Sequence, residues 1–179
     1  MTTTFERCFQ KLLINEGGYA HLAGDRGGRT WYGVSERAQP AYFQRILEAT
    51  TPKERVAIAR ECYHQQYWAS MRCESMPEPL AFRLFDAAVL IGPIAATRCL
   101  QRALVVAGAD IVVDGLMGPK TFAAAQKRWQ RYERTLVGWT TWYVGAHFQN
   151  VAENPEQRKF LWGWGKRLIE PELTGDDET

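Results

Sequence analysis

The first hydrophobic pattern in the chain has a helical period and ends in a carboxylate. Phe5, Phe9, Leu12 and Glu16 follow one another at helical spacing, which predicts a helix with these side chains on its inward face. The pair Gly17-Gly18 then ends this helix, because glycine adopts the left-handed conformation at little cost. Partial burial and the negative end of the helix dipole both favour the protonated form of Glu16. The pattern therefore indicates a candidate general acid.

Further helices follow, separated by proline and glycine. Residues 17–34 are rich in glycine and predict an irregular loop with a small hairpin turning at Gly27-Gly28. Thr51-Pro52-Lys53-Glu54 is a helix-start signal, with a capping residue, a proline at the first position and a glutamate at the third. The pattern predicts a mainly α-helical fold. Its expected helices cover residues 4–16, 35–49, 52–68, 80–91, 93–108, 119 onward, 130–152 and 155–169.

Composition narrows the class of protein. The chain has 179 residues, 46% of them apolar and 23% charged, which is typical of a soluble globular protein. A net charge of +2 gives no support for a nucleic-acid partner, although it permits weak association with an anionic wall polymer. No apolar run approaches the roughly 20 residues of a membrane span, so we expect no stable membrane insertion. The first residues lack a basic region followed by an apolar one, so we expect no signal peptide.

Cysteine and histidine give little support for a metal site. The spacing of the cysteines contains no short pair, so we expect reduced thiols, no metal and no cofactor. A hydrolase that uses a thiol with a histidine remains an alternative, although no cysteine lies in a recognisable nucleophile context. The residues concerned are Cys8, Cys62, Cys73, Cys99, His21, His64 and His147.

Two further polar residues lie in the glycine-rich loop after Glu16. Asp25 comes nine residues later and Thr30 five beyond that. A loop folded back on a helix end can place a second carboxylate opposite the first, and two such carboxyls carry out glycoside hydrolysis. Thr30 could hold the water molecule that takes part in this hydrolysis. The alternatives are that Glu16 pairs with an arginine and that Asp25 bonds its own backbone in a turn.

These residues resemble glycoside hydrolase family 108. Asn15-Glu16-Gly17-Gly18-Tyr19 and Asp25-Arg26-Gly27-Gly28-Arg29-Thr30-Trp31-Tyr32-Gly33-Val34 are similar to the family's Glu-Gly-Gly-Tyr and Asp-x-Gly-Gly-x-Thr-x-x-Gly-Ile patterns. Val34 occupies the position of the final Ile in the second pattern. The family includes phage endolysins and bacterial muramidases, so the resemblance implies a lysozyme-like helical domain. A short β-hairpin or glycine-rich loop would lie beside its active-site cleft, and Glu16 would be the catalytic acid, assisted by Asp25 and Thr30.

The resemblance extends into the second half of the chain. Asp114-Gly115-Leu116-Met117-Gly118-Pro119-Lys120-Thr121 is similar to the turn pattern of the family's C-terminal, peptidoglycan-binding-like part, and Phe160–Arg167 is similar to its closing motif. We therefore expect a catalytic lobe of residues 1–91 and a helical peptidoglycan-binding-like lobe of residues 92–179, packed as one compact unit. Leu90 departs from the family pattern, which commonly has Asn there.

Aromatic residues flank the proposed carboxylates. Tyr19, Trp31 and Tyr32 offer flat faces for sugar rings, with core packing as the alternative. Asp86 lies among apolar residues, so it either forms a buried contact, for example with Arg83, or lies at the floor of the cleft and binds substrate. Five C-terminal tryptophans are expected in the core, and an exposed pair would indicate a wall-facing or membrane-facing surface. They are Trp129, Trp139, Trp142, Trp162 and Trp164.

The resemblance implies an endolysin that cleaves the β-1,4 bond between N-acetylmuramic acid and N-acetylglucosamine in peptidoglycan. We expect a monomer without a nucleic-acid partner. It would accumulate in the host bacterial cytoplasm before lysis and then act on the periplasmic cell wall. The alternatives are a non-catalytic peptidoglycan-binding protein, in which Glu16 is structural, and a secretion accessory that shares the chemistry.

Overall fold

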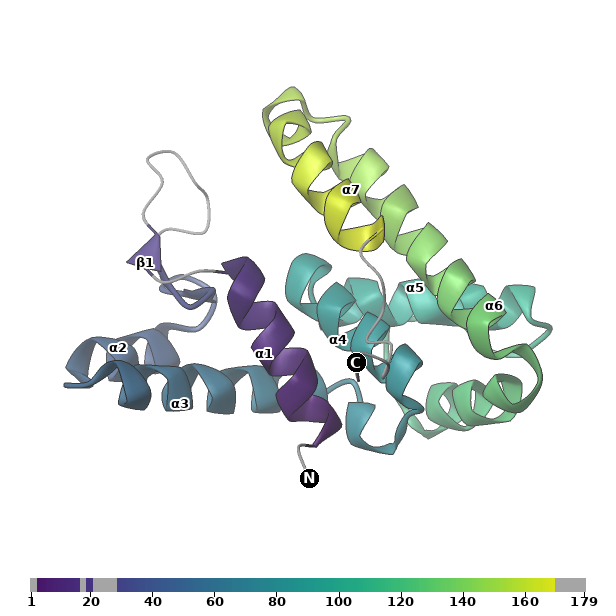
Figure 1. The fold of residues 1–179 in the computed structure, drawn as a ribbon. Helices are drawn as coiled ribbons and strands as arrows, with labels where there is room; N and C mark the ends of the chain where they lie inside the picture. Colours follow the sequence, from purple (N-terminus) through teal and green to yellow (C-terminus); the bar gives the residue numbers. More distant parts are fainter. Residues whose placement is uncertain (1–2, 17–18, 21–28, 170–179) are drawn as a thin grey trace, which may run out of the picture. The chain divides into compact units, whose positions relative to one another are not determined.

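The computed structural model describes residues 3–16, 19–20 and 29–169 of the chain. The chain divides into two compact units, Met1–Ala69 and Ser70–Thr179, and both are mainly helical (Figure 1). The first unit also carries a small antiparallel sheet. The predicted fold class is therefore confirmed. The predicted boundary between lobes at residue 91 stays a prediction.

The first unit begins with a helix and a sheet and continues with two paired helices. Thr51 caps α3 as expected: its hydroxyl accepts a hydrogen bond from the Glu54 amide at 3.2 Å, and the Glu54 carboxylate accepts one from the Thr51 amide at 3.2 Å. The elements are α1 (Thr4–Glu16), β1 (Tyr19–Ala20), β2 (Thr30–Trp31), β3 (Val34–Ser35), α2 (Pro40–Glu48), α3 (Pro52–Tyr63) and the π-helical η1 (His64–Ala69).

Aromatic contacts fix α1 in the first unit. Phe5 and Phe9 are buried, as the hydrophobic spacing predicts. The Phe5 ring lies 5.4 Å from the Trp68 ring, and the Phe9 ring lies 5.8 Å from the Tyr63 ring, measured between centroids. Each pair lies in the range in which aromatic rings attract beyond simple burial. The end of α3 and the following η1 therefore hold α1 along its inward face.

The small sheet has the strand order β1-β2-β3, and all of its pairs are antiparallel. A two-residue turn joins β2 to β3, with Tyr32 at φ 49° and Gly33 at φ 74°. Two positive φ values are typical of the type I′ turn that matches strand twist, but they are unusual for tyrosine. The Tyr63 hydroxyl donates a hydrogen bond to the Tyr32 carbonyl at 3.1 Å and so supports this conformation. The turn expected at Gly27-Gly28 lies outside the described residues.

The second unit is built around α4, which is buried along most of its length, as its apolar sequence predicts. Both α5 and α6 pack against α4, and α7 packs against α6. The elements are η2 (Cys73–Ser75), α4 (Glu78–Ile91), α5 (Pro93–Val106), α6 (Pro119–Val151), η3 (Pro155–Phe160) and α7 (Leu161–Ile169).

The long helix α6 is interrupted at Glu133, where φ is 3° and ψ is −98°. Figure 1 shows the two parts of α6 running in different directions. The sequence predicts two helices here, one starting at Pro119 and one near Gln130, and the break at Glu133 agrees with that division. No proline or glycine lies at this point of the chain, so local residue preference does not explain the break.

The expectation that the C-terminal tryptophans lie in the core is wrong for three of them. Trp164 is half-buried and stacks on Phe148 at 4.8 Å between ring centroids. Trp139, Trp142 and Trp162 are exposed by 39%, 64% and 86%. Helices α6 and α7 bury other faces against their neighbours, so hydrophobicity alone did not indicate which tryptophans face inward.

Candidate active site

The backbone places the proposed catalytic segment next to the small sheet. Helix α1 ends at Glu16, and β1 begins three residues later at Tyr19. In the sheet, Tyr19 is paired with Trp31, and Ala20 is paired with Thr30. The structure therefore places β1 beside β2, three residues after Glu16 in the chain. The side chains of Glu16 and Tyr19 and the whole of Asp25 lie outside the described part of the chain, so their roles stay predictions.

Trp31 and Tyr32 form a half-buried aromatic cluster at the tip of the hairpin. Their ring centroids lie 5.6 Å apart. The Arg55 guanidinium carbon lies 5.0 Å from the centroid of the Trp31 ring, and Arg55 also donates a hydrogen bond to the Ala49 carbonyl at 3.0 Å. This cation–π contact connects the hairpin to α3. Sequence reasoning did not identify Arg55, because 24 residues separate it from Trp31 and no local pattern connects them.

An ion pair closes the base of the same hairpin. Arg29 precedes β2 and Glu36 follows β3, and the two side chains form a double contact at 3.0 and 2.6 Å. The hydrogen bonds from Arg29 lower the pKa of the Glu36 carboxyl below its ordinary value. Both side chains are more than two-fifths exposed, so we assign the pair a modest part in holding the hairpin that carries Thr30 and Trp31.

Asp86 lies in the second unit, on α4, and is only 6% exposed. Its carboxylate Oδ1 accepts a hydrogen bond from Arg167 Nε at 2.7 Å, and its Oδ2 lies 3.7 Å from Arg83 Nη1. The contact with Arg83 is one of the two alternatives drawn from the sequence. Contact with Arg167, on α7, could not be read from sequence spacing. A role in substrate binding stays a prediction.

The cysteines are poorly suited to nucleophilic catalysis. All four are buried, and none of them forms a disulfide bond. Burial raises the pKa of the Cys62 thiol to about 12 and that of the Cys99 thiol to about 11. The reactive form of cysteine is the thiolate, so these two groups are protonated and inert near neutral pH. The structure therefore gives no support to the thiol-hydrolase alternative at these positions.

Two properties of the described residues bear on the kind of site. Among residues 3–16, 19–20 and 29–169, no group of three or more histidine, cysteine, aspartate or glutamate side chains could hold a metal ion. In the same part of the chain, no helix combines the length and apolar character that crossing a membrane requires.

Comparison with known proteins identifies both halves of the chain. Residues 9–92 match the family described as glycosyl hydrolase 108, and residues 95–169 match the family described as predicted peptidoglycan domain. No curated protein matches the chain. The solved structure of SagA from Brucella abortus is similar, with a TM-score of 0.73 and 24% sequence identity over 92% of this chain and 89% of that chain. At this identity the likeness shows the fold alone.

The first match includes the whole Glu16, Asp25 and Thr30 motif, and the second includes most of α5 and all of α6 and α7. The family resemblance seen in the sequence is therefore confirmed. The chain carries a glycosyl hydrolase 108 region followed by a predicted peptidoglycan domain, in a mainly helical, lysozyme-like fold, and is a glycoside hydrolase that acts on peptidoglycan.

Proposed function

We propose that the protein is an N-acetylmuramidase, which cleaves the β-1,4 bond between N-acetylmuramic acid and N-acetylglucosamine, with Glu16 as the general acid. The match to the glycosyl hydrolase 108 family over residues 9–92 carries this proposal, because it includes the complete carboxylate motif. The fold supports it in a second way. Glu16 ends α1, where the helix dipole disfavours negative charge, and the chain then enters the sheet that holds Thr30 and Trp31.

Each residue of the motif has a role that its chemistry allows. Glu16 protonates the glycosidic oxygen as the bond breaks. Asp25 either activates a water molecule or supports the positive charge that develops on the sugar, and Thr30 helps to hold the water. Tyr19, Trp31 and Tyr32 contact the apolar faces of the sugar rings. These steps require no cofactor.

Replacing the acid tests the mechanism. Glu16→Gln removes the proton donor and preserves its size, so it should lower kcat on purified cell walls by about a hundredfold or more. Glu6→Gln is the matched control, because Glu6 lies on the same helix but forms an ion pair with Arg60. If Glu16→Gln clears cell walls at the rate of the unmodified protein, Glu16 is not the acid.

The products identify the bond. Digestion of peptidoglycan by a muramidase exposes new reducing ends of N-acetylmuramic acid, which can be identified by borohydride reduction and mass spectrometry. New reducing ends of N-acetylglucosamine would indicate the other glycan bond. Free peptide stems would indicate an amidase or a peptidase. Either result contradicts the proposed specificity, but the first of them would leave Glu16 as a possible acid for a different glycosidase.

The biological role follows from the family resemblance. We propose that the protein is an endolysin of a phage or prophage, held in the host cytoplasm until a membrane pore admits it to the periplasmic wall. It would act as a monomer without a nucleic-acid partner. Deletion of its gene from an inducible prophage should delay host lysis without reducing the number of assembled particles.

A further inference from the structure

The last helix of the second unit has two faces of different character. Trp164 stacks on Phe148 at 4.8 Å and on Phe160 at 5.8 Å between ring centroids. The bond from Arg167 to Asp86 adds a polar attachment to α4. These contacts fix the rotation of α7 about its own axis. The residues on its opposite side, Trp162, Gly165, Lys166 and Ile169, form what we call the α7 outer face.

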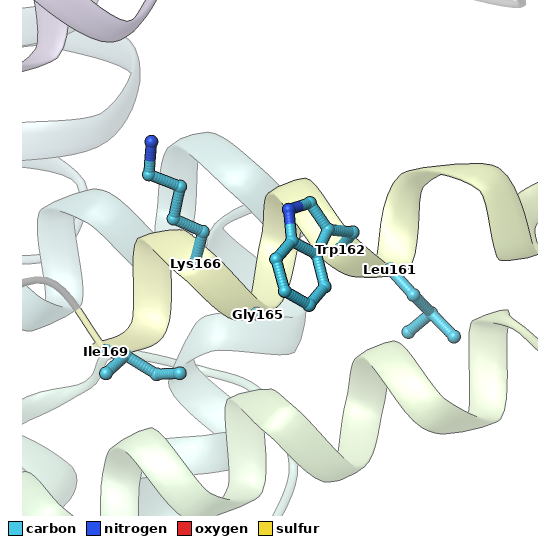
Figure 2. Close-up of a pocket in the computed structure, with 5 residues that line it drawn as sticks. All are labelled: Leu161, Trp162, Gly165, Lys166 and Ile169. Carbon is cyan, nitrogen blue, oxygen red and sulfur yellow. The ribbon is translucent and has the colours of Figure 1, made fainter.

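The α7 outer face exposes large apolar side chains to solvent. Trp162 is 86% exposed and Ile169 is 83% exposed. Trp162, Lys166 and Ile169 are spaced by four and then three residues, so they form one stripe along the helix. The surface here is hollowed by about 370 Å³, a space lined by the α7 outer face together with Leu161. Figure 2 shows Trp162 and Lys166 on neighbouring turns of the helix, with Gly165 between them.

Gly165 lines this hollow, and neither packing nor backbone conformation requires a glycine there. A Cβ atom built at Gly165 or at Gly163 would meet nothing within 4 Å, and neither residue has a positive φ. Alanine at either position would favour the helix by about 1 kcal/mol. Packing and backbone conformation therefore do not account for the two glycines. Their effect is to leave a flat strip of backbone beside the Trp162 indole, where a ring could lie.

The side chains that line the hollow carry one charge, which is positive. Lys166 is the charged side chain among the five that line the hollow. Peptidoglycan strands combine sugar rings, whose apolar faces stack on indole, with carboxylates on their peptide stems, which pair with ammonium groups.

We propose that the α7 outer face is a glycan-binding subsite for peptidoglycan, in which Trp162 stacks on a sugar ring and Lys166 pairs with a stem carboxylate. The subsite deepens the proposed function, on which it rests for the identity of the polymer. A lipid bilayer fits less well, because an ammonium group lies in the middle of the stripe and the helix is only nine residues long. A second copy of the chain also fits less well, because two-fold symmetry through the stripe would place two Lys166 side chains together.

Binding to insoluble peptidoglycan sacculi tests the subsite. The full chain carrying Glu16→Gln is mixed with sacculi, and the protein left in solution is measured across a range of sacculus concentrations. Trp162→Ala should weaken binding by about tenfold, the effect of losing one well-placed aromatic contact. Lys166→Met should weaken it less and should reduce its dependence on salt. Gly165→Leu should also weaken binding, because the leucine side chain would occupy part of the hollow. The variant should remain folded, because leucine favours a helix more than glycine does.

Trp142→Ala is the matched control. Trp142 lies on α6 of the same unit, is 64% exposed, and borders a hollow that it shares with Thr135, Gly138 and Trp139 but with no lysine. Its replacement should leave binding to sacculi within about twofold. Circular dichroism would establish that each variant is folded.

The proposal is overturned if Trp162→Ala and Gly165→Leu both bind sacculi as the parent does. It is also overturned if Trp162→Ala abolishes binding to vesicles of phosphatidylcholine and phosphatidylglycerol but not to sacculi, or if it converts a dimer to a monomer in sedimentation. Reducing ends released by the Glu16→Gln protein are measured in parallel. Their continued release would count against Glu16 as the acid and would leave the binding comparison intact.

Discussion

The Asp86 carboxylate accepts a hydrogen bond of 2.7 Å from Arg167 Nε, across 81 residues of sequence. Arg83 lies on the other side of the same carboxylate, so one buried negative charge faces two buried guanidinium groups that connect α4 to α7. Asp86→Ala should therefore lower the free energy of unfolding by about 3–5 kcal/mol, because it removes the buried negative charge that lies beside both arginines. Urea denaturation measures this change.

Asp86→Asn distinguishes the structural role of this residue from substrate binding. The amide retains a hydrogen-bond acceptor for Arg167 but loses the charge. If Asp86 only supports the fold, the folded Asp86→Asn protein should keep the KM of the unmodified protein for soluble peptidoglycan fragments. A raised KM at unchanged stability would support the sequence-based prediction that Asp86 binds substrate.

The contact between Arg55 and Trp31 predicts a graded effect on substrate binding. Trp31→Ala should raise KM by about tenfold if its ring stacks on a sugar. Arg55→Met should raise KM by less, with kcat nearly unchanged, because it leaves the Trp31 ring in place and removes the charge 5.0 Å from the ring centroid together with the hydrogen bond to Ala49. Arg45→Met is the control, since Arg45 lies over the Tyr42 ring at 5.4 Å on α2. Equal effects of both arginine variants would argue against a positioning role for Arg55.

Gln101 is fully buried and holds the turn before α6. Its amide nitrogen donates to Asp114 Oδ1 at 2.7 Å and to Thr121 Oγ1 at 3.0 Å, and its amide oxygen accepts from the Gly115 N–H at 2.8 Å. Gln101→Leu leaves the buried Gly115 N–H unpaired and should cost about 1–3 kcal/mol in the free energy of unfolding. The exposed Gln126 on α6 is the control, and Gln126→Leu should change stability by less than about 0.5 kcal/mol.

His147 gives the second unit a pH dependence with a defined sign. Burial, and to a smaller extent the charge of Arg102, lower the pKa of His147 below its ordinary value of 6.5. As pH falls below 6.5 toward the folded-state pKa, the unfolded chain takes up the proton first, so the free energy of unfolding decreases. His147→Gln should remove this part of the decrease in denaturation experiments across that range. An unchanged pH profile would show that His147 does not contribute to it.

The buried thiols predict resistance to alkylation. With the pKa of Cys62 raised to about 12 and that of Cys99 to about 11, iodoacetamide should modify the native protein slowly and the urea-unfolded protein rapidly. Cell-wall hydrolysis should persist after treatment of the native protein. Rapid loss of activity that follows the labelling of one cysteine would reopen the thiol mechanism.

Several features of this protein were determined by short stretches of sequence alone. The capping box at Thr51, the helix starts at Pro93 and Pro119, and the inward face of α1 all appear as expected. Each depends on interactions between residues within about four positions of one another, so local sequence is sufficient. The glycosyl hydrolase 108 motif also needs no structure to be seen, because its residues are close in the chain.

Other features were decided only by tertiary structure. The pairing of Asp86 with Arg167, the stacking of Arg55 on Trp31, and the left-handed tyrosine at position 32 all require segments distant in sequence to meet. The exposure of Trp162 is the clearest case. Trp162 and Trp164 are two residues apart in one helix. Trp164 is half-buried against Phe148, whereas Trp162 lies in solvent. Hydrophobicity favours burial of both, and the face of α7 that packs against α6 determines which one is half-buried and which one is exposed.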